Sequence, residues 1–224
     1  MKKIIKKTRF ILLAIVALFI FFLIVNKPLP EGEKGAKAND LAIKMLQSLD
    51  LQSYENTAYI EWEFPGGHHY QWNKLKKEVT VSWSDNKVKL DLKEYEESYV
   101  IEGDGDTNKL IQKAIDYFNN DSFWLVAPYK IFDEGTERSI VNYKGKEALL
   151  ITYTSGGSTP GDSYLWILDE NAKPVSFRMW VSIIPIGGLE ATWSDWTITA
   201  TGANLPTQHK IWGIPINITK LKTY

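Results

Sequence analysis

The apolar N-terminal segment constrains the fold more than any other feature of the chain. Residues 10–25, FILLAIVALFIFFLIV, carry no charged or polar side chain, and five basic residues precede them: Lys2, Lys3, Lys6, Lys7 and Arg9. Sixteen helical residues span about 24 Å, slightly less than a bilayer core, and snorkelling lysines can extend the span. We therefore predict a basic cytoplasmic tail at 1–9 and a single transmembrane helix at 10–25. Because basic flanks stay in the cytoplasm, the rest of the chain is expected outside.

A cleaved signal peptide is the alternative interpretation of the same segment. Ala36-Lys37-Ala38 matches the small-x-small cleavage pattern, but it lies 13 residues beyond the apolar run. That distance favours a retained anchor. Both interpretations predict an extracytoplasmic domain, which would be periplasmic in a Gram-negative cell, and the retained anchor places it at the cell membrane as a single-pass protein.

Charge and cysteine content exclude several classes of protein and site. Beyond the N-terminal segment the chain holds 21 Lys and Arg against 27 Asp and Glu, a net charge of −6. A mildly acidic domain lacks the basic surface that nucleic acid requires. The absence of cysteine excludes disulfides, thiolate metal sites, a cysteine nucleophile and lipidation at an N-terminal cysteine.

After a predicted linker at 26–38, the pattern of the chain indicates one domain at 39–224. Apolar residues at helical spacing predict helices at about 39–51 and 107–118. Short runs rich in aromatic and β-branched residues, bounded by Gly, Pro, Asn or Asp, predict eight to ten strands. Residues 119–135 fit neither period. The order helix, strands, helix, strands predicts an α+β fold with a large, mostly antiparallel sheet.

Several of the predicted strands are apolar on both faces. SYLWIL (163–168) alternates Tyr164, Trp166 and Leu168 against two aliphatic residues, and VSFRMWV (175–181) carries Trp180 on the face opposite Phe177. A sheet with one solvated face alternates apolar and polar residues more cleanly, so both faces need a cover. Helices can cover one face, and a second sheet or an apolar ligand cavity would account for the other. For any single Trp, ordinary core packing remains the alternative.

Some of these segments resemble the lipoprotein carriers LolA and LolB and their half-barrel relatives. The resemblance rests on the N-terminal helix leading into YENTAYIEWEF, on DSFWLVAPYKIFDEG at 121–135, and on PGDSYLWILD at 160–169. It covers about residues 38–224 and implies a curved antiparallel sheet, a half-barrel, that wraps two or more helices around a cavity suited to acyl chains. LolA is a free carrier and LolB is lipidated, whereas this chain has an apolar anchor and no cysteine, so the carrier role does not transfer directly.

The three histidines are the first candidates for a metal site. His68 and His69 are adjacent in a predicted strand, so their side chains point to opposite faces, and His209 lies far along the chain. We therefore predict no metal site. The segment EGDGDTN (102–108) lacks the length and closing Glu of a calcium loop and indicates a turn with a helix N-cap.

No catalytic motif is present either. The chain contains no G-x-S-x-G, Walker loop, dinucleotide fingerprint or HExxH. GGSTPGDS (156–163) offers serines beside Asp162 but is typical of a hairpin loop. We predict neither an enzyme nor a cofactor.

The predicted function is binding of a hydrophobic ligand, a lipid or the acyl part of a lipoprotein. Residues 119–135 are the predicted gate. Two alternatives remain: a carbohydrate-binding domain, which needs exposed Trp rings in a polar groove, and a scaffolding domain of an envelope complex. Protein partners are not predicted. The candidate ligand-binding residues are Trp83, Trp166, Trp180 and Trp193 on the sheet and Trp124, Tyr129 and Phe132 at the gate.

Overall fold

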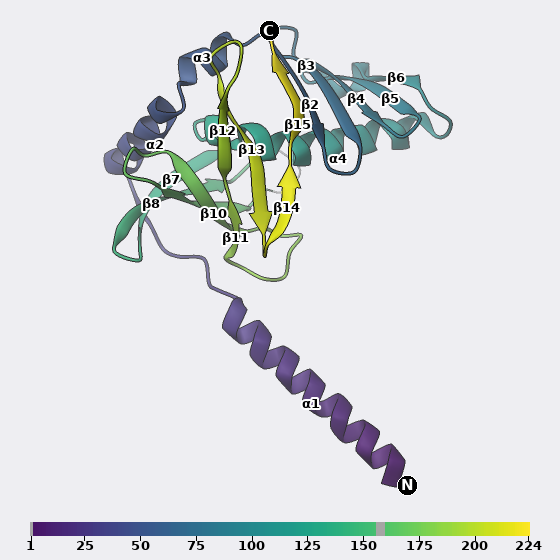
Figure 1. Ribbon diagram of the computed structural model, residues 1–224, viewed down its shortest axis with the longest axis vertical. Coiled ribbons are helices and arrows are strands. Elements are labelled where there is room, and N and C mark those ends of the chain that lie inside the picture. Colours follow the sequence, from purple (N-terminus) through teal and green to yellow (C-terminus); the bar gives the residue numbers. More distant parts are fainter. Residues whose placement is uncertain (1, 156–159) are drawn as a thin grey trace.

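The structure is a computed structural model that describes residues 2–155 and 160–224, without the side chains of residues 2–10 and of Phe19. Figure 1 shows a long N-terminal helix that projects from a β-rich domain. The helices are α1 (Lys2–Val25), α2 (Ala36–Ser48), α3 (Leu51–Asn56), η1 (Tyr95–Glu97), α4 (Thr107–Val126) and η2 (Ala127–Lys130). The strands are β1 (Glu33–Lys34), β2 (Tyr59–Phe64), β3 (His68–Asn73), β4 (Glu78–Trp83), β5 (Asn86–Asp91), β6 (Tyr99–Glu102), β7 (Thr136–Tyr143), β8 (Lys146–Tyr153), β9 (Ser163–Leu168), β10 (Pro174–Trp180), β11 (Leu189–Thr192), β12 (Ser194–Ile198), β13 (Asn204–Ile211), β14 (Ile214–Asn217) and β15 (Thr219–Thr223).

The strands form two antiparallel sheets instead of the single curved sheet that the sequence predicts. The small sheet has the order β15-β2-β3-β4-β5-β6, and the large sheet has the order β1-β7-β8-β9-β10-β11-β13-β12, with β14 paired to β13. Among the described residues neither sheet closes into a barrel. The α+β class and the antiparallel pairing are confirmed, but the sheet divides where β14 leads into β15.

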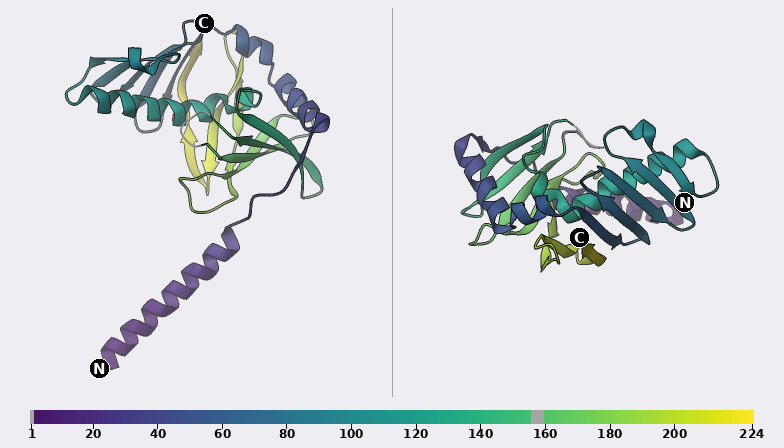
Figure 2. Two further views of the ribbon diagram at one scale, coloured as in Figure 1. Left: turned by 180° about the vertical axis from the view of Figure 1, so that it is seen from behind. Right: turned by 90° about the horizontal axis from the view of Figure 1, so that it is seen from above.

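Helix α4 joins the two sheets. It contacts β4, β5 and β6 of the small sheet along its length and β13 of the large sheet, as the two views in Figure 2 show. The small sheet has the clean alternation of a sheet with one solvated face. Its inner face buries Ile60, Trp62, Tyr70, Val79, Val81, Val88 and Leu90 against α4.

Strands β8 and β9 of the large sheet are buried on both faces, and the sequence predicts this for β9. Leu149 and Ile151 face the main core, while Leu150 and Ala148 join a second apolar cluster on the opposite face. The segment after α1 contacts this outer side at two places. The backbone of Lys27 donates to the Gly187 carbonyl at 2.9 Å, and β1 pairs with β7. The segment predicted as a solvated linker is therefore bound to the domain.

The prediction that 119–135 is irregular is wrong for residues 119–126, which are helical, and agrees with the turns at 131–135. Helix α4 runs on to Val126, and Trp124, Leu125, Val126 and Ala127 are all buried. A helix that is covered on every side has no polar face, so the 3.6-residue period disappears from its sequence. Most of residues 121–131 are buried in the core, whereas residues 132–134 are exposed, so only the end of the segment lies at the surface.

The first domain helix begins earlier than the sequence predicts. Helix α2 starts at Ala36, directly after Gly35, and Asn39 lies within it and accepts a hydrogen bond from Arg138 Nε at 2.8 Å. The start of the second long helix is as predicted, because Asp106 caps α4 through the Lys109 amide at 3.0 Å.

The membrane helix predicted at 10–25 lies within α1. Over the side chains that the structure describes, no helix is long and apolar enough to cross a bilayer. The anchor therefore stays a prediction.

Candidate functional site

An aromatic cluster fills the space between α4 and the inner face of the large sheet. It consists of Trp124 from α4, Trp166 from β9, Phe177 from β10, Trp193 between β11 and β12, and His209 from β13. The Trp193 ring is central, with centroid distances of 4.5 Å to His209, 4.9 Å to Trp166 and 6.4 Å to Trp124. The fold therefore brings together three of the seven predicted ligand-binding residues.

Three polar atoms of the aromatic cluster are buried without a hydrogen-bond partner. They are the indole Nε1 of Trp166, the indole Nε1 of Trp193 and Nε2 of His209. A buried polar group left unsatisfied costs about 1–3 kcal/mol. An oxygen-bearing ligand group inside this apolar shell would remove part of that cost.

His209 is neutral at physiological pH. Burial lowers its pKa to about 4, and the hydrogen bond to the Thr192 carbonyl, which favours the protonated ring, offsets this only in part. Its Nδ1 lies 3.1 Å from the Thr192 carbonyl oxygen. Because a carbonyl only accepts, Nδ1 carries the hydrogen.

Two of the predicted lining residues lie away from the aromatic cluster. Trp83 is on β4 in the small sheet, 5.6 Å from the Tyr117 ring. Trp180 lies on the outer face of the large sheet, where its Nε1 donates to the Lys27 carbonyl at 2.8 Å. Trp180 therefore faces away from the aromatic cluster.

The other two predicted gate residues are also separate from the aromatic cluster. The Tyr129 hydroxyl donates to the carbonyls of Leu49 at 2.9 Å and Asn204 at 2.6 Å, so this buried side chain holds η2 in place. Phe132 is 42% exposed, and the Arg138 guanidinium lies over its ring, with Cζ 4.3 Å from the ring centroid. Neither contact involves a residue of the aromatic cluster.

A surface hollow of about 310 Å³ lies on the outer side of the large sheet. Trp180, Val181, Ser182, Ile184 and Gly187 line one part of it, and residues 160–162 line the rest. Its volume is at the lower end of the range of small-molecule sites. Trp180 thus contributes to an open hollow instead of an interior cavity.

The sequence analysis missed a buried carboxylate network that connects α4 to β3. Asp121 is almost fully buried, and its Oδ2 accepts from Tyr70 OH at 2.5 Å and lies 2.7 Å from His68 Nδ1. Its Oδ1 accepts from Asn120 Nδ2 at 2.8 Å. Burial raises the pKa of Asp121 above the usual range of an aspartate, and the three hydrogen bonds lower it only in part.

The Asp121 network explains the histidine pair. His68 shares the inner face with Tyr70 and stacks on Tyr117 at 3.8 Å, while His69 points outward, 3.8 Å from Glu61. The predicted opposite orientation of the two histidines is confirmed. Within the described ranges, no group of three or more His, Asp or Glu side chains could hold a metal ion.

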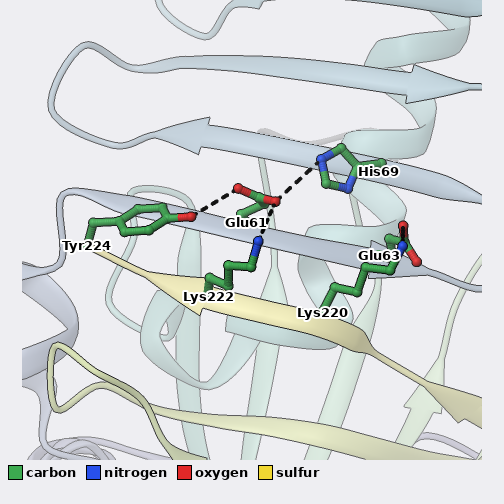
Figure 3. A network of polar contacts seen from close by, with 6 residues as sticks. All are labelled: Glu61, Glu63, His69, Lys220, Lys222 and Tyr224. Carbon is green, nitrogen blue, oxygen red and sulfur yellow. Dashed lines mark hydrogen bonds and ion pairs between the residues drawn. The ribbon is translucent and has the colours of Figure 1, made fainter.

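A polar network on the solvent face connects the C-terminal strand to β2. Figure 3 shows Glu61 at its centre, with Lys222 Nζ at 3.3 Å, Tyr224 OH at 3.1 Å and His69 at 3.8 Å. Lys220 bonds Glu63 beside it at 2.7 Å. Although burial acts in the other direction, the hydrogen bonds from Tyr224 and Lys222 hold the pKa of Glu61 below its usual value.

Removing the Glu61 charge is expected to have a small effect. We expect Glu61→Gln to lower the free energy of unfolding by less than about 1 kcal/mol, because exposed ion pairs are weak. Since the folded-state pKa is lowered, this contribution is present above the unfolded-state pKa and is lost as the pH falls through the folded-state value. Urea unfolding at pH 7 and pH 3 measures both effects. If Glu61→Gln lowered the free energy of unfolding by more than about 2 kcal/mol, closer to the cost of breaking a buried ion pair, the result would contradict this prediction.

Comparisons with known proteins place the chain in no family. No family model matches it, and no curated protein matches it. Among solved structures, the chain is similar to a DUF1329 family protein from Desulfovibrio piger, with 11% identity and a TM-score of 0.42 over 85% of this chain and 93% of that one. At that score the likeness carries no argument about function, and the resemblance to LolA and LolB stays a prediction.

Proposed function

We propose that the protein is a membrane-anchored, extracytoplasmic binding protein for an amphiphilic ligand, a lipid or the acyl part of a lipoprotein. The observation that carries this proposal is the aromatic cluster with its unpartnered polar atoms. The ring faces of Trp124 and Phe177 suit an acyl chain, whose burial contributes about 0.8 kcal/mol per CH₂. The indole N–H groups of Trp166 and Trp193 suit an ester or carboxyl oxygen.

The exposure of the Trp rings supports this proposal over carbohydrate binding. Stacking of a sugar needs flat aromatic faces in an open groove, but five of the nine Trp side chains are buried: Trp62, Trp83, Trp124, Trp166 and Trp193. A scaffolding role would need no ligand at all, and the experiment below separates it from lipid binding.

Two observations support a retained anchor over a cleaved signal peptide. Cleavage after Ala38 would remove β1, which pairs with β7, and the first turn of α2. The apolar side chains of α1 are also exposed to the surroundings, including Ile11, Leu13, Leu18 and Ile24. In this proposal, α1 places these side chains in the bilayer.

The test uses the full chain in nanodiscs that contain a trace of lipid with a photoreactive acyl chain. After illumination, peptide mass spectrometry locates the lipid adducts. We expect adducts on peptides that contain Trp124 and Trp166, in addition to adducts on α1. Adducts on α1 alone would overturn ligand binding and favour scaffolding, and adducts on neither would overturn the anchor as well.

A pair of matched variants separates binding from general weakening of the core. Trp62 and Trp166 are both fully buried and both have an unpartnered Nε1, but Trp62 lies on the small sheet outside the aromatic cluster. Trp166→Phe removes the proposed donor and is expected to lower the adduct yield on the aromatic cluster about threefold to tenfold, the value of one hydrogen bond. Trp62→Phe should leave that yield unchanged. Equal losses in both variants would assign the effect to stability.

A further inference from the structure

Large apolar side chains are exposed at the end of the domain from which α1 projects. Ile183 is on the loop between β10 and β11 and is 73% exposed. Trp212, 60% exposed, and Ile214, 67% exposed, lie at the turn between β13 and β14. We call these three residues the apolar rim. Figures 1 and 2 show both the loop and the turn on the side of α1.

Strand register places the two parts of the apolar rim close together. Strands β11 and β13 are antiparallel, with Ala191 opposite Ile211. The residues that precede Ala191 therefore run beside those that follow Ile211. The loop that contains Ile183 enters β11 at the same end of the sheet where the turn at Trp212 leaves β13.

Hydrogen bonds hold the loop at the end of α1. The Gly187 amide donates to Asn26 Oδ1 at 2.7 Å, and the Lys27 amide donates to the Gly187 carbonyl at 2.9 Å. A Cβ at Gly187 would lie 2.6 Å from Trp180 Cδ1 and 2.7 Å from the Lys27 carbonyl oxygen, so this close approach requires glycine. Because α1 ends at Val25, the loop is fixed within one or two residues of the end of the helix.

We propose that the apolar rim docks on the lipid bilayer, in the interfacial layer where α1 emerges. This inference rests on the anchor of the proposed function. If Val25 lies at the edge of the hydrocarbon core, Asn26 and the loop bonded to it lie among the headgroups. Trp is suited to that layer because its ring is apolar and its N–H is polar.

Apolar burial, and not charge, holds the apolar rim on the membrane. The charged residues that flank or bond the loop and the turn include Lys27, Arg178 and Lys210 and, with the opposite charge, Asp162 and Glu190. So few basic groups give weak attraction to anionic lipid. Docking is therefore expected to be insensitive to salt.

Docking would place the surface hollow at the membrane surface. Ser182, Ile184 and Gly187 line the hollow and belong to the same loop as Ile183. A lipid leaving the bilayer at this point would meet Trp180 and Ile184 first. The hollow thus has the position of a first contact site for the amphiphilic ligand.

The absence of cysteine makes the test direct, because one introduced cysteine takes one label. Four full-length variants are labelled with an environment-sensitive fluorophore: Ile183→Cys, Trp212→Cys, Ile198→Cys and Leu18→Cys. The matched control is Ile198, 75% exposed, which pairs with Asn204 at the opposite end of β13. Leu18, 73% exposed, reports on the anchor. Each variant is placed in nanodiscs with and without a nitroxide-labelled lipid that quenches near the headgroups.

We expect roughly twofold quenching or more at positions 183 and 212, as for side chains at the level of the headgroups, and none at position 198. A blue-shifted emission at 18 without quenching at 183 and 212 would overturn the apolar rim and leave the anchor intact. Equal quenching at 198 would show that the whole domain collapses onto the bilayer, which also overturns it. The absence of a blue shift at 18, which the anchor places in the hydrocarbon core, would overturn the anchor itself, and with it this inference.

Discussion

Asp121→Ala is expected to lower the free energy of unfolding by about 3–5 kcal/mol, the cost of breaking a buried charged network by removing one partner. The substitution leaves Tyr70 OH and His68 Nδ1 without their acceptor in the space between α4 and β3. It also removes a polar contact between the last two turns of α4 and β3 of the small sheet. Urea unfolding of the full chain in detergent measures the loss.

The control for this prediction is on the same helix. Asp116 is exposed, and its Oδ1 accepts a hydrogen bond from Gln112 Nε2 at 2.9 Å, so Asp116→Ala should change stability by no more than about 0.5 kcal/mol. Similar losses from both substitutions would mean that the Asp121 network contributes nothing beyond a surface contact.

The pH dependence of stability gives the Asp121 prediction a second readout. Because burial raises the folded-state pKa of Asp121, the folded state holds this proton more tightly than the unfolded chain. Stability from this group is therefore complete below the unfolded-state pKa, about 4, and is lost as the pH rises through the folded-state value. As the pH rises from the unfolded-state pKa of Asp121 to its folded-state pKa, the wild type should therefore lose stability relative to Asp121→Asn. The opposite slope would mean that the hydrogen bonds outweigh burial.

Local patterns predicted the small sheet well. Alternation with a period of two is typical of a strand with one buried face, as for Val79, Val81 and Trp83 on β4, and the same alternation separates His68 from His69. A proline such as Pro215 is typical of an edge strand, and among the described residues β14 pairs with β13 alone. Each of these features depends on neighbouring residues, so the sequence carries it directly.

The division into two sheets depends on pairings between distant segments. Strand β15 pairs with β2 at the other end of the domain, and β1 pairs with β7. Such partners leave no local pattern. The second half of α4 was missed for a related reason, because contact with both sheets removed the polar face that marks a helix.

The candidate site could be predicted only in part. Alternation along β10 showed that Phe177 and Trp180 lie on opposite faces, but it could not show which face is the interior. Trp180 was therefore grouped with Trp166 although it lies outside. Asp121 and His68 are 53 residues apart in the sequence, and no local pattern at either residue predicts that their side chains meet. His209 reaches Trp193 through the same kind of distant contact.

Trp193→Ala is expected to lower the free energy of unfolding by about 3–5 kcal/mol, the range for removing a large aromatic side chain from a core. Trp193 is 2% exposed, and its ring contacts Trp124, Trp166 and His209 among others. No small movement can fill the space of an indole held between a helix and three strands. Urea unfolding of the full chain in detergent measures the change.

The matched control removes the same side chain from the surface. Trp212 is 60% exposed, so Trp212→Ala should change stability in detergent by no more than about 0.5 kcal/mol. If ligand occupies the aromatic cluster, added lipid should raise the stability of the wild type and of Trp212→Ala by mass action. It should not raise that of Trp193→Ala, whose site is disrupted. If added lipid stabilised all three proteins equally, lipid would not bind at the aromatic cluster, and Trp193 would act only as a core residue.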